Sequence, residues 1–406
     1  MRYGCFLLLL VAAQIAPAAN TTIPACQDIT APGDYSLAAN LLETQVNTAC
    51  LRIHDTQDVH LDCNFNAIKG GGGNPAPAIS INNVEGFSIT HCTLQAENGR
   101  VLTASNSDDG DIVDNTIGNL TDQRQFLVQL EFVNNTRLMR NTINAAFQQL
   151  YSSGNLLRLN TVTCPLWTNN SGCAGVLLSV LGSNNTMERN ELDGKGSAST
   201  GQNGADDGII VQDESGDILS NNKIRNTWDV GIETLGNIAN MQIVSNSIAN
   251  VALGGIGGWY WNSWSNVAVI NNTVSHAQYL FRFFRAYGLR PQNWDGRGVP
   301  ADTAVYFQDN LFSGNEFTDG SFPASASAYI PIYNYLDYNN GVSALVGERV
   351  AQKSDFHLNS NTFTRNDFGH IEAAPYFSGP FTVGEIIDGG GNICANPGLN
   401  YPLVCK

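Results

Sequence analysis

Basic side chains are scarce in this chain: 20 Lys and Arg stand against 36 Asp and Glu, which gives a net charge of −16. Nucleic-acid binding needs a basic stripe that neutralises phosphates, and none is visible, so the composition disfavours a nucleic-acid partner. The same deficit disfavours binding to an anionic membrane. The acidity also favours a neutral ligand over a polyanionic one, unless a cation bridges the two.

Signs of a metal–thiolate site are missing too, because no Cys-x-x-Cys occurs and the six histidines are scattered. The apolar run Cys5–Ala13 is too short to span a bilayer. It follows the charged Met1-Arg2 and precedes Ala16-Pro17-Ala18, an arrangement typical of a signal peptide. We therefore expect a signal peptide over residues 1–18 and a secreted protein, either periplasmic or extracellular.

Removal of Cys5 with the signal peptide leaves eight cysteines, an even number typical of an exported, disulfide-bonded chain. Eight cysteines allow 105 pairings, so connectivity cannot be read from the sequence alone. Close spacing along the chain favours pairing between sequence neighbours. The expected disulfides are Cys26–Cys50, Cys63–Cys92, Cys164–Cys173 and Cys394–Cys405.

The most regular feature is a repeat of an apolar residue, two variable residues, Asn, one variable residue and another apolar residue. Its shorter intervals of 19, 24 and 26 residues are typical of a solenoid. The repeated asparagines are Asn115, Asn141, Asn160, Asn190, Asn222, Asn246, Asn272, Asn315 and Asn361, and looser copies contain Asn66 and Cys92.

Each repeat is interpreted as a short strand, a corner at Asn and a second short strand. Asn suits a corner because it tolerates the left-handed conformation, and stacked asparagines can hydrogen-bond along the coils. Leucine-rich repeats share the period but need a dense Leu-x-x-Leu-x-Leu frame that is absent here. The pattern predicts an all-β fold, a right-handed parallel β-helix. The expected buried stack is Ile112, Leu138, Leu157, Met187, Leu219, Ile243 and Val269.

Longer intervals between asparagines mark loop insertions in the middle and C-terminal coils, whereas the N-terminal coils are plainer. Loops on a rigid scaffold are where function usually resides. We expect one β-helix domain over residues 19–406, with an N-terminal cap region (19–60) and a disulfide-closed C-terminal tail (385–406). The insertions expected to flank the site are Thr161–Asn203 and Phe284–Val305.

The opening segment Cys26-Gln-Asp-Ile-Thr-Ala-Pro-Gly-Asp-Tyr-Ser-Leu37, with Leu51-Arg-Ile53 and Val59-His-Leu-Asp62, carries a resemblance. It is similar to the start of the β-helix domains of exported carbohydrate-binding proteins and sugar hydrolases, the pectate-lyase-like and polygalacturonase-like superfamily. The resemblance implies the β-helix fold and a carbohydrate ligand. The group includes lyases, hydrolases, epimerases, adhesins and a copper-enzyme maturation factor, so fold alone does not assign a reaction.

Acidic residues gather where two neighbouring coils begin. Alignment of Gly208 with Gly231 places Asp206 beside Asp229, about 4.8 Å away along the stack. Two carboxylates at that spacing resist double ionisation, so one holds a proton or both share a cation, calcium being the candidate. Glu233 lies four residues after Asp229, up to about 13 Å along a strand, which is wide for a hydrolytic pair.

Turn residues are the simpler interpretation of these acids, and Asp213 and Glu214 are expected in a solvated turn. The segment Gly204-Ala-Asp206-Asp207-Gly208 resembles the Gly-Asp-Asp element of polygalacturonase-type glycosidases. That resemblance reaches only Asp206 and Asp207, because the family's Gly-His-Gly is replaced here by Asp229-Val-Gly231.

Aromatic residues follow in the next coil, within Gly254-Gly-Ile-Gly-Gly-Trp-Tyr-Trp-Asn-Ser-Trp264. Sugar rings stack on aromatic faces, and glycines leave room for a ligand, although a hydrophobic plug under a loop is the alternative. If Leu280 aligns with Gly255, Arg282 shares a column with Glu233 and Gly257. The expected ligand-binding residues are Trp259, Tyr260, Trp261, Trp264, His276, Tyr279 and Arg285.

Two classes of function follow, and whether the chain is an enzyme stays open, with cleavage favoured. The first class is a polysaccharide-cleaving enzyme that uses Asp206, Asp207, Asp229 and Glu233, without a cofactor if it is a hydrolase. A calcium-assisted lyase, with calcium on Asp206 and Asp229 and Arg282 as the base, is a variant of it. The second class is a non-catalytic glycan-binding or surface protein.

Overall fold

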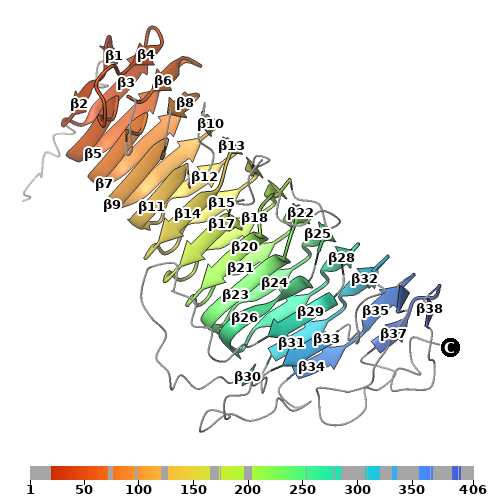
Figure 1. Ribbon diagram of the computed structural model, residues 1–406. Helices are drawn as coiled ribbons and strands as arrows, with labels where there is room; N and C mark the ends of the chain where they lie inside the picture. The colour runs from red at the N-terminus through yellow and green to blue at the C-terminus, as the bar shows by residue number, and fades with distance from the viewer. Residues whose placement is uncertain are drawn as a thin grey trace, which may run out of the picture.

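The computed structural model describes residues 20–71, 76–96, 99–119, 127–164, 173, 175–195, 204–252, 254–277, 279–284, 307–308, 310–320, 332–335, 356–365, 367–368, 386–391 and 393–394. The expected signal peptide lies outside these residues. Within them all regular structure is β, and the coils stack from the N-terminal to the C-terminal end of one elongated solenoid (Figure 1). No helix in the described ranges has the length and apolarity to cross a membrane.

Every strand pairing is parallel, as expected of a β-helix, and most strands fall into two long sheets. The narrower sheet contains β4 (Leu41–Leu42), β6 (Ala67–Lys69), β8 (Thr93–Ala96), β10 (Thr116–Asn119), β13 (Thr142–Asn144), β16 (Thr161–Thr163), β19 (Glu191–Asp193), β22 (Lys223–Thr227), β25 (Ser247–Val251), β28 (Thr273–Ser275), β32 (Glu316–Thr318), β35 (Asn361–Thr364) and β37 (Ile386–Asp388).

The wider sheet begins with β1 (Thr21–Ile23), β2 (Gln27–Ile29), β3 (Gly33–Leu37), β5 (Leu51–Asp62), β7 (Ile79–Thr90), β9 (Leu102–Val113) and β11 (Val128–Asn134). It then divides into two rows. The site row is β14 (Phe147–Leu150), β17 (Gly175–Val180), β20 (Asp207–Gln212), β23 (Val230–Ala239), β26 (Gly254–Ser265), β29 (Tyr279–Phe284) and β33 (Ile332–Tyr335).

The second row is β12 (Arg137–Met139), β15 (Leu156–Arg158), β18 (Thr186–Glu188), β21 (Ile218–Ser220), β24 (Gln242–Val244), β27 (Ala268–Ile270), β31 (Asn310–Ser313) and β34 (Phe356–Asn359), with the short β30 (Phe307–Gln308) pairing with β26. A separate two-stranded pairing joins β36 (Asp367–Phe368) to β38 (Ile393–Cys394).

The predicted apolar stack is confirmed. Ile112 pairs in register with Leu138, Leu138 with Leu157, and the series continues through every predicted member to Val269. None of the seven side chains is more than 2% exposed. Because each coil contributes one apolar side chain at the same height, the core runs unbroken along the axis.

The predicted asparagine ladder is also confirmed. Asn190 shows its pattern: its backbone N–H and its side-chain amide both donate to Oδ1 of Asn222 at 3.0 Å. The same amide donates to the Leu157 carbonyl at 2.9 Å. Each buried corner therefore satisfies its own polar groups and those of the coil before it.

The conformation expected of these asparagines is wrong. Positive φ occurs one residue earlier, at Asp114 (58°), Arg140 (55°) and Asn221 (56°), and none of the buried ladder asparagines has it. The left-handed residue makes the turn on the exposed side, which turns the following Asn inward to bridge two coils.

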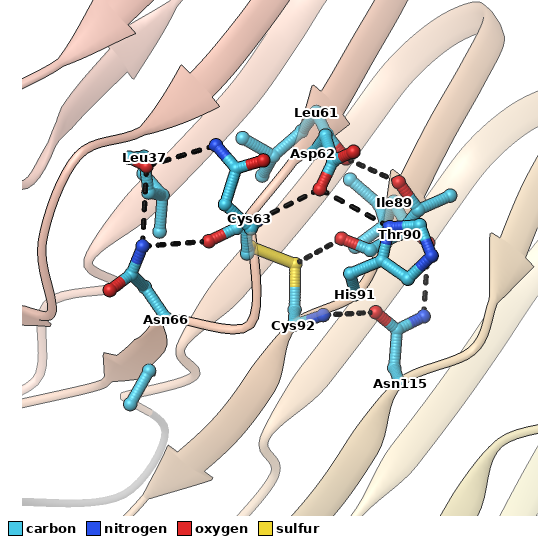
Figure 2. Close-up of a disulfide and its surroundings, with 12 residues drawn as sticks. Leu37, Leu61, Asp62, Cys63, Asn66, Ile89, Thr90, His91, Cys92 and Asn115 are labelled. Atoms are coloured by element: carbon cyan, nitrogen blue, oxygen red, sulfur yellow. Dashed lines mark hydrogen bonds and ion pairs between the residues drawn. A yellow bond between two sulfur atoms is a disulfide. The ribbon is translucent and has the colours of Figure 1, made fainter.

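A disulfide takes the place of an asparagine near the N-terminal end (Figure 2). Cys92 occupies the ladder position of its coil, is bonded to Cys63, and donates its N–H to Oδ1 of Asn115 at 2.9 Å. Three of the four predicted disulfides are present: Cys26–Cys50, Cys63–Cys92 and Cys164–Cys173. The fourth involves Cys405, which lies outside the described residues.

A second buried polar ladder lies after the C-terminal ends of the site-row strands, between β20 and β21 in the coil of Glu214. The expectation that Glu214 lies in a solvated turn is wrong. Glu214 is 2% exposed and accepts hydrogen bonds from Ser179 Oγ, Gly182 N and Asn185 Nδ2. Asp217, fully buried, accepts the N–H of Asn185 through Oδ1 at 2.8 Å. Asp213 is half-buried with a φ of 50°.

Candidate functional site

The predicted acids lie at the N-terminal ends of β20 and β23, two neighbouring strands of the site row. Asp206 N–H donates to the Cys173 carbonyl at 2.9 Å, and the Asp206 carbonyl accepts the N–H of Asp229 at 2.7 Å. These bonds fasten the segment before β20 to a cysteine of the Cys164–Cys173 disulfide on one side and to the next coil on the other. The predicted register, with Asp206 beside Asp229, is therefore confirmed.

Glycine at position 208 permits this close stacking. A Cβ there would lie 2.3 Å from Cγ2 of Ile224 and 2.4 Å from the Gly231 carbonyl oxygen, and the second contact is with the backbone of the next coil. The glycine therefore lets β20 lie close to the next coil immediately after the two aspartates.

Three carboxyl groups converge here. One oxygen of each of Asp207, Asp229 and Glu233 lies within 4.8 Å of the others. The expectation that Asp229 and Glu233 stand far apart is wrong, because it counted strand length and ignored side chains that reach toward each other. Asp207 and Glu233 are buried, Asp229 is half-buried and Asp206 is exposed, so solvent reaches the group from the side of Asp206 and Asp229.

Electrostatics in this group favours retained protons. Restricted hydration around the carboxyl, and then the negative charge of Asp229, raise the pKa of Asp206 to about 6. Burial, reinforced by the charges of Glu233, Asp229 and Asp206, raises the pKa of Asp207 well above its ordinary value. The N–H of Val230 donates to Oδ1 of Asp207 at 2.9 Å and partly offsets that rise.

Calcium could fit among these oxygens. Calcium–oxygen distances are about 2.3–2.6 Å, so two ligands on opposite sides of an ion lie about 5 Å apart. The separation of at most 4.8 Å among Asp207, Asp229 and Glu233 satisfies that limit. Asp206, expected as a ligand with Asp229, is not among the three. Calcium takes six to eight oxygens, so three carboxylates would form only part of its shell.

The predicted column across the coils is confirmed, since Glu233 pairs with Gly257 and Gly257 with Arg282. Trp259, Tyr260, Trp261, Tyr279 and Arg282 lie on β26 and β29, but their side chains are outside the described part of the structure. Arg285 lies outside it entirely. His276 is an exposed turn residue after β28.

Trp264 does not face a ligand, so that prediction is wrong. The side chain is fully buried, and its Nε1 donates to Oγ1 of Thr234 at 2.9 Å. Its ring lies parallel to that of Phe312 with 6.0 Å between centroids. Trp264 belongs to the core.

One feature beside the acids was not predicted. Ile210 is the register neighbour of Glu233, and it is buried in a small apolar cluster with Leu150, Leu178, Val180 and Leu235. The signal was present in the continuous apolar run Gly208-Ile-Ile-Val211, because a strand buried on both faces loses its alternation. The acids therefore adjoin a dry surface, which strengthens charge interactions within the group.

Comparison with known proteins supports the fold. Residues 149–294 match the family model of the right-handed beta helix region. The ORF18 protein of Geobacillus virus E2 is 10% identical with a TM-score of 0.38, over 66% of this chain and 50% of that one, so this chain spans half its length.

Alginate lyase AlyF-OU02, solved with G6, is 14% identical with a TM-score of 0.41, over 89% of this chain and 81% of that one. The surface adhesin PfbA of Streptococcus pneumoniae is 10% identical with a TM-score of 0.40, over 92% and 83%. The search of curated proteins gave no match. At these identities and TM-scores the three structures carry no argument about this chain.

Proposed function

We propose that this chain is a secreted carbohydrate-active protein that cleaves a polysaccharide with the carboxyl groups at the start of β20 and β23. The observation that carries the proposal is the convergence of Asp207, Asp229 and Glu233 within 4.8 Å, beside the solvent-exposed Asp206. Three disulfides support export, because such bonds persist in oxidising compartments.

In the proposed hydrolase, Asp206 is the general acid and protonates the glycosidic oxygen as the bond to the sugar breaks. A pKa near 6 suits a group that must hold and release a proton near neutral pH. Asp229, on the adjacent coil, attacks the anomeric carbon, and a water molecule deprotonated by Asp206 then releases the sugar from Asp229. Spacings of about 5 Å between carboxyl groups are typical of retaining glycosidases, whereas inverting enzymes need roughly 6.5–9.5 Å.

A calcium-assisted lyase is the second candidate, and the confirmed column of Glu233, Gly257 and Arg282 favours it. Here Asp207, Asp229 and Glu233 would hold the ion against a uronate carboxylate. Arg282, in its neutral form, would remove the proton next to that carboxylate as the glycosidic C–O bond breaks. The leaving oxygen takes a proton from water, and the other product is an unsaturated sugar.

A substrate screen separates the candidates. The purified protein is incubated with neutral and uronate polysaccharides, with calcium and with a chelator. A hydrolase releases new reducing ends without ultraviolet-absorbing products and tolerates chelation. A lyase forms absorbing unsaturated ends from a uronate polymer and stops when calcium is removed. No cleavage of any polymer would refute the proposal.

A further inference from the structure

A column of left-handed turn residues crosses the N-terminal and middle coils, away from the acids. The strand registers align these residues one coil apart, and each has a φ between 47° and 61°. The members of this turn column are Asp55, Asn83, Asn106, Phe132, Tyr151, Leu181 and Asp213.

Three bulky residues in the turn column are unexpected. Asn and Asp tolerate a positive φ, whereas Phe, Tyr and Leu do so at a cost of order 1–3 kcal/mol. Burial does not offset that cost at Phe132, which is 47% exposed. The Phe132 ring instead lies parallel to that of Tyr151, with centroids 4.8 Å apart and an interplanar angle of 10°. Stacking covers one face of each ring, so the exposed part of Phe132 includes the ring face that points away from Tyr151.

A polar hollow of about 580 Å³ lies over the coils that precede Phe132, on the opposite side of this residue from Tyr151. Asn106 lines it and is the register neighbour of Phe132, about 4.8 Å along the stack. Within the described residues, the exposed side chains of Gln57, Glu85 and Asn106 make no hydrogen bond to protein groups. The lining is Thr30, Pro32, Asp55, Thr56, Gln57, Asn83, Val84, Glu85, Asn106 and Asp108.

The chemistry of this lining selects the ligand. Carboxylates and amides match the many hydroxyl groups of a sugar, and an aromatic face stacks against its ring. Asp55, Glu85 and Asp108 repel uronates, sulfates and phosphates. The hollow lacks the broad apolar surface that a protein partner would need. The ligand that fits both parts is a neutral oligosaccharide.

We propose that the hollow and the Phe132–Tyr151 pair form a binding site for a neutral oligosaccharide, distinct from the acid cluster. The acids lie at the N-terminal end of β20, whereas the turn column includes Asp213, which follows the C-terminal end of the same strand. From Phe132 to Asp213 is three coils, roughly 14 Å along the axis. The site would serve an enzyme by holding the polymer, and it does not depend on cleavage.

The test is electrophoresis of the folded protein in native gels that contain galactomannan, xyloglucan, laminarin or alginate. We expect at least one neutral polymer to retard the protein and alginate not to. Phe132→Asn should weaken retardation about fivefold or more, which corresponds to about 1 kcal/mol of lost stacking. Because Asn suits a positive φ, the variant should melt no lower than the parent.

Leu159→Asn is the matched control. Like Phe132, Leu159 is about half exposed (45%) and has a positive φ (58°), but it belongs to the turn that precedes the ladder residue Asn160 and not to the turn column. Its retardation should equal that of the parent. Retardation reports binding at this hollow and the substrate screen reports cleavage at the acids, so the two proposals fail separately. The proposal is overturned if no neutral polymer binds, if Phe132→Asn binds normally, or if Leu159→Asn loses binding as Phe132→Asn does.

Discussion

Replacement of Asp217 by Asn should reduce a pH-dependent weakness of the core. Asn155 and Asn185 each donate their side-chain amide to a carbonyl of the preceding coil, that of Val133 or Ser152. Asp217 occupies the same ladder position, and its Oδ2 is buried without a hydrogen-bond partner. A proton shared with Glu214 resolves this, because Glu214 already accepts three donors.

The magnitude follows from proton linkage. Burial, and then the charge of Asp217, raise the pKa of Glu214, and burial raises the pKa of Asp217. The folded pair thus keeps a proton that the unfolded chain releases above about pH 4. Stability is complete below that pH and falls by about 1.4 kcal/mol per pH unit until the folded pair titrates. Asp217→Asn supplies a permanent donor and removes the charge of Asp217 beside Glu214, so the slope should become shallower.

The assay is thermal unfolding of both proteins at pH 5, 6 and 7. Between pH 5 and 7 the variant should gain up to about 3 kcal/mol over the parent, the full amount if the folded pair holds its proton throughout. For 406 residues that is roughly 3 °C in Tm. Asp213→Asn, in the same coil but half-buried, is the control and should keep the parent's slope. A constant difference between Asp217→Asn and the parent across these pH values would refute the shared proton.

Three further predictions concern the ladder, the site and the C-terminal region. Asn222→Ala leaves buried groups of neighbouring coils unpaired and should lower the unfolding free energy by about 3–6 kcal/mol in urea titrations; a loss below 1 kcal/mol would contradict the ladder's role. Activity should fall as pH rises through about 6, where Asp206 ionises, and Asp229→Asn should move that limb to lower pH; an unmoved limb would exclude Asp206 as the acid. Peptide mapping of the unreduced protein should join Cys394 to Cys405, and a free thiol at either would contradict it.

The fold was predictable because one repeat encodes it: the apolar positions and asparagines recur at every coil, and errors in any one coil do not change the pattern. Local conformation was not. The left-handed residue precedes Asn because the ladder needs the Asn side chain inside, a requirement that appears only when coils are stacked. Asp213-Glu214-Ser-Gly216 has the composition of a solvated turn, yet the second ladder buries Glu214.

The sequence predicted which residues of the site lie side by side on neighbouring coils, but it predicted less well which way their side chains face. The registers of Asp206 with Asp229 and of Glu233 with Arg282 follow from aligning residues near the start of each strand, Gly208 with Gly231 and Leu280 with Gly255. Trp264 was misassigned for another reason. The pairing of β23 with β26 shifts by two residues between Thr234 and Gly236, and it places Trp264 beside the buried Ile238. Nothing in the Trp-rich run marks such a shift.

The central claim is that the acids at the start of β20 and β23 perform chemistry. Its most direct test is the turnover of Asp206→Asn and Asp229→Asn on a polysaccharide that the parent cleaves, with unchanged thermal melting as evidence of folding. Each isosteric change should lower turnover about 100-fold or more, as loss of a proton-transferring group does. If both variants fold and retain full turnover, the acids are turn residues and the proposed function is wrong.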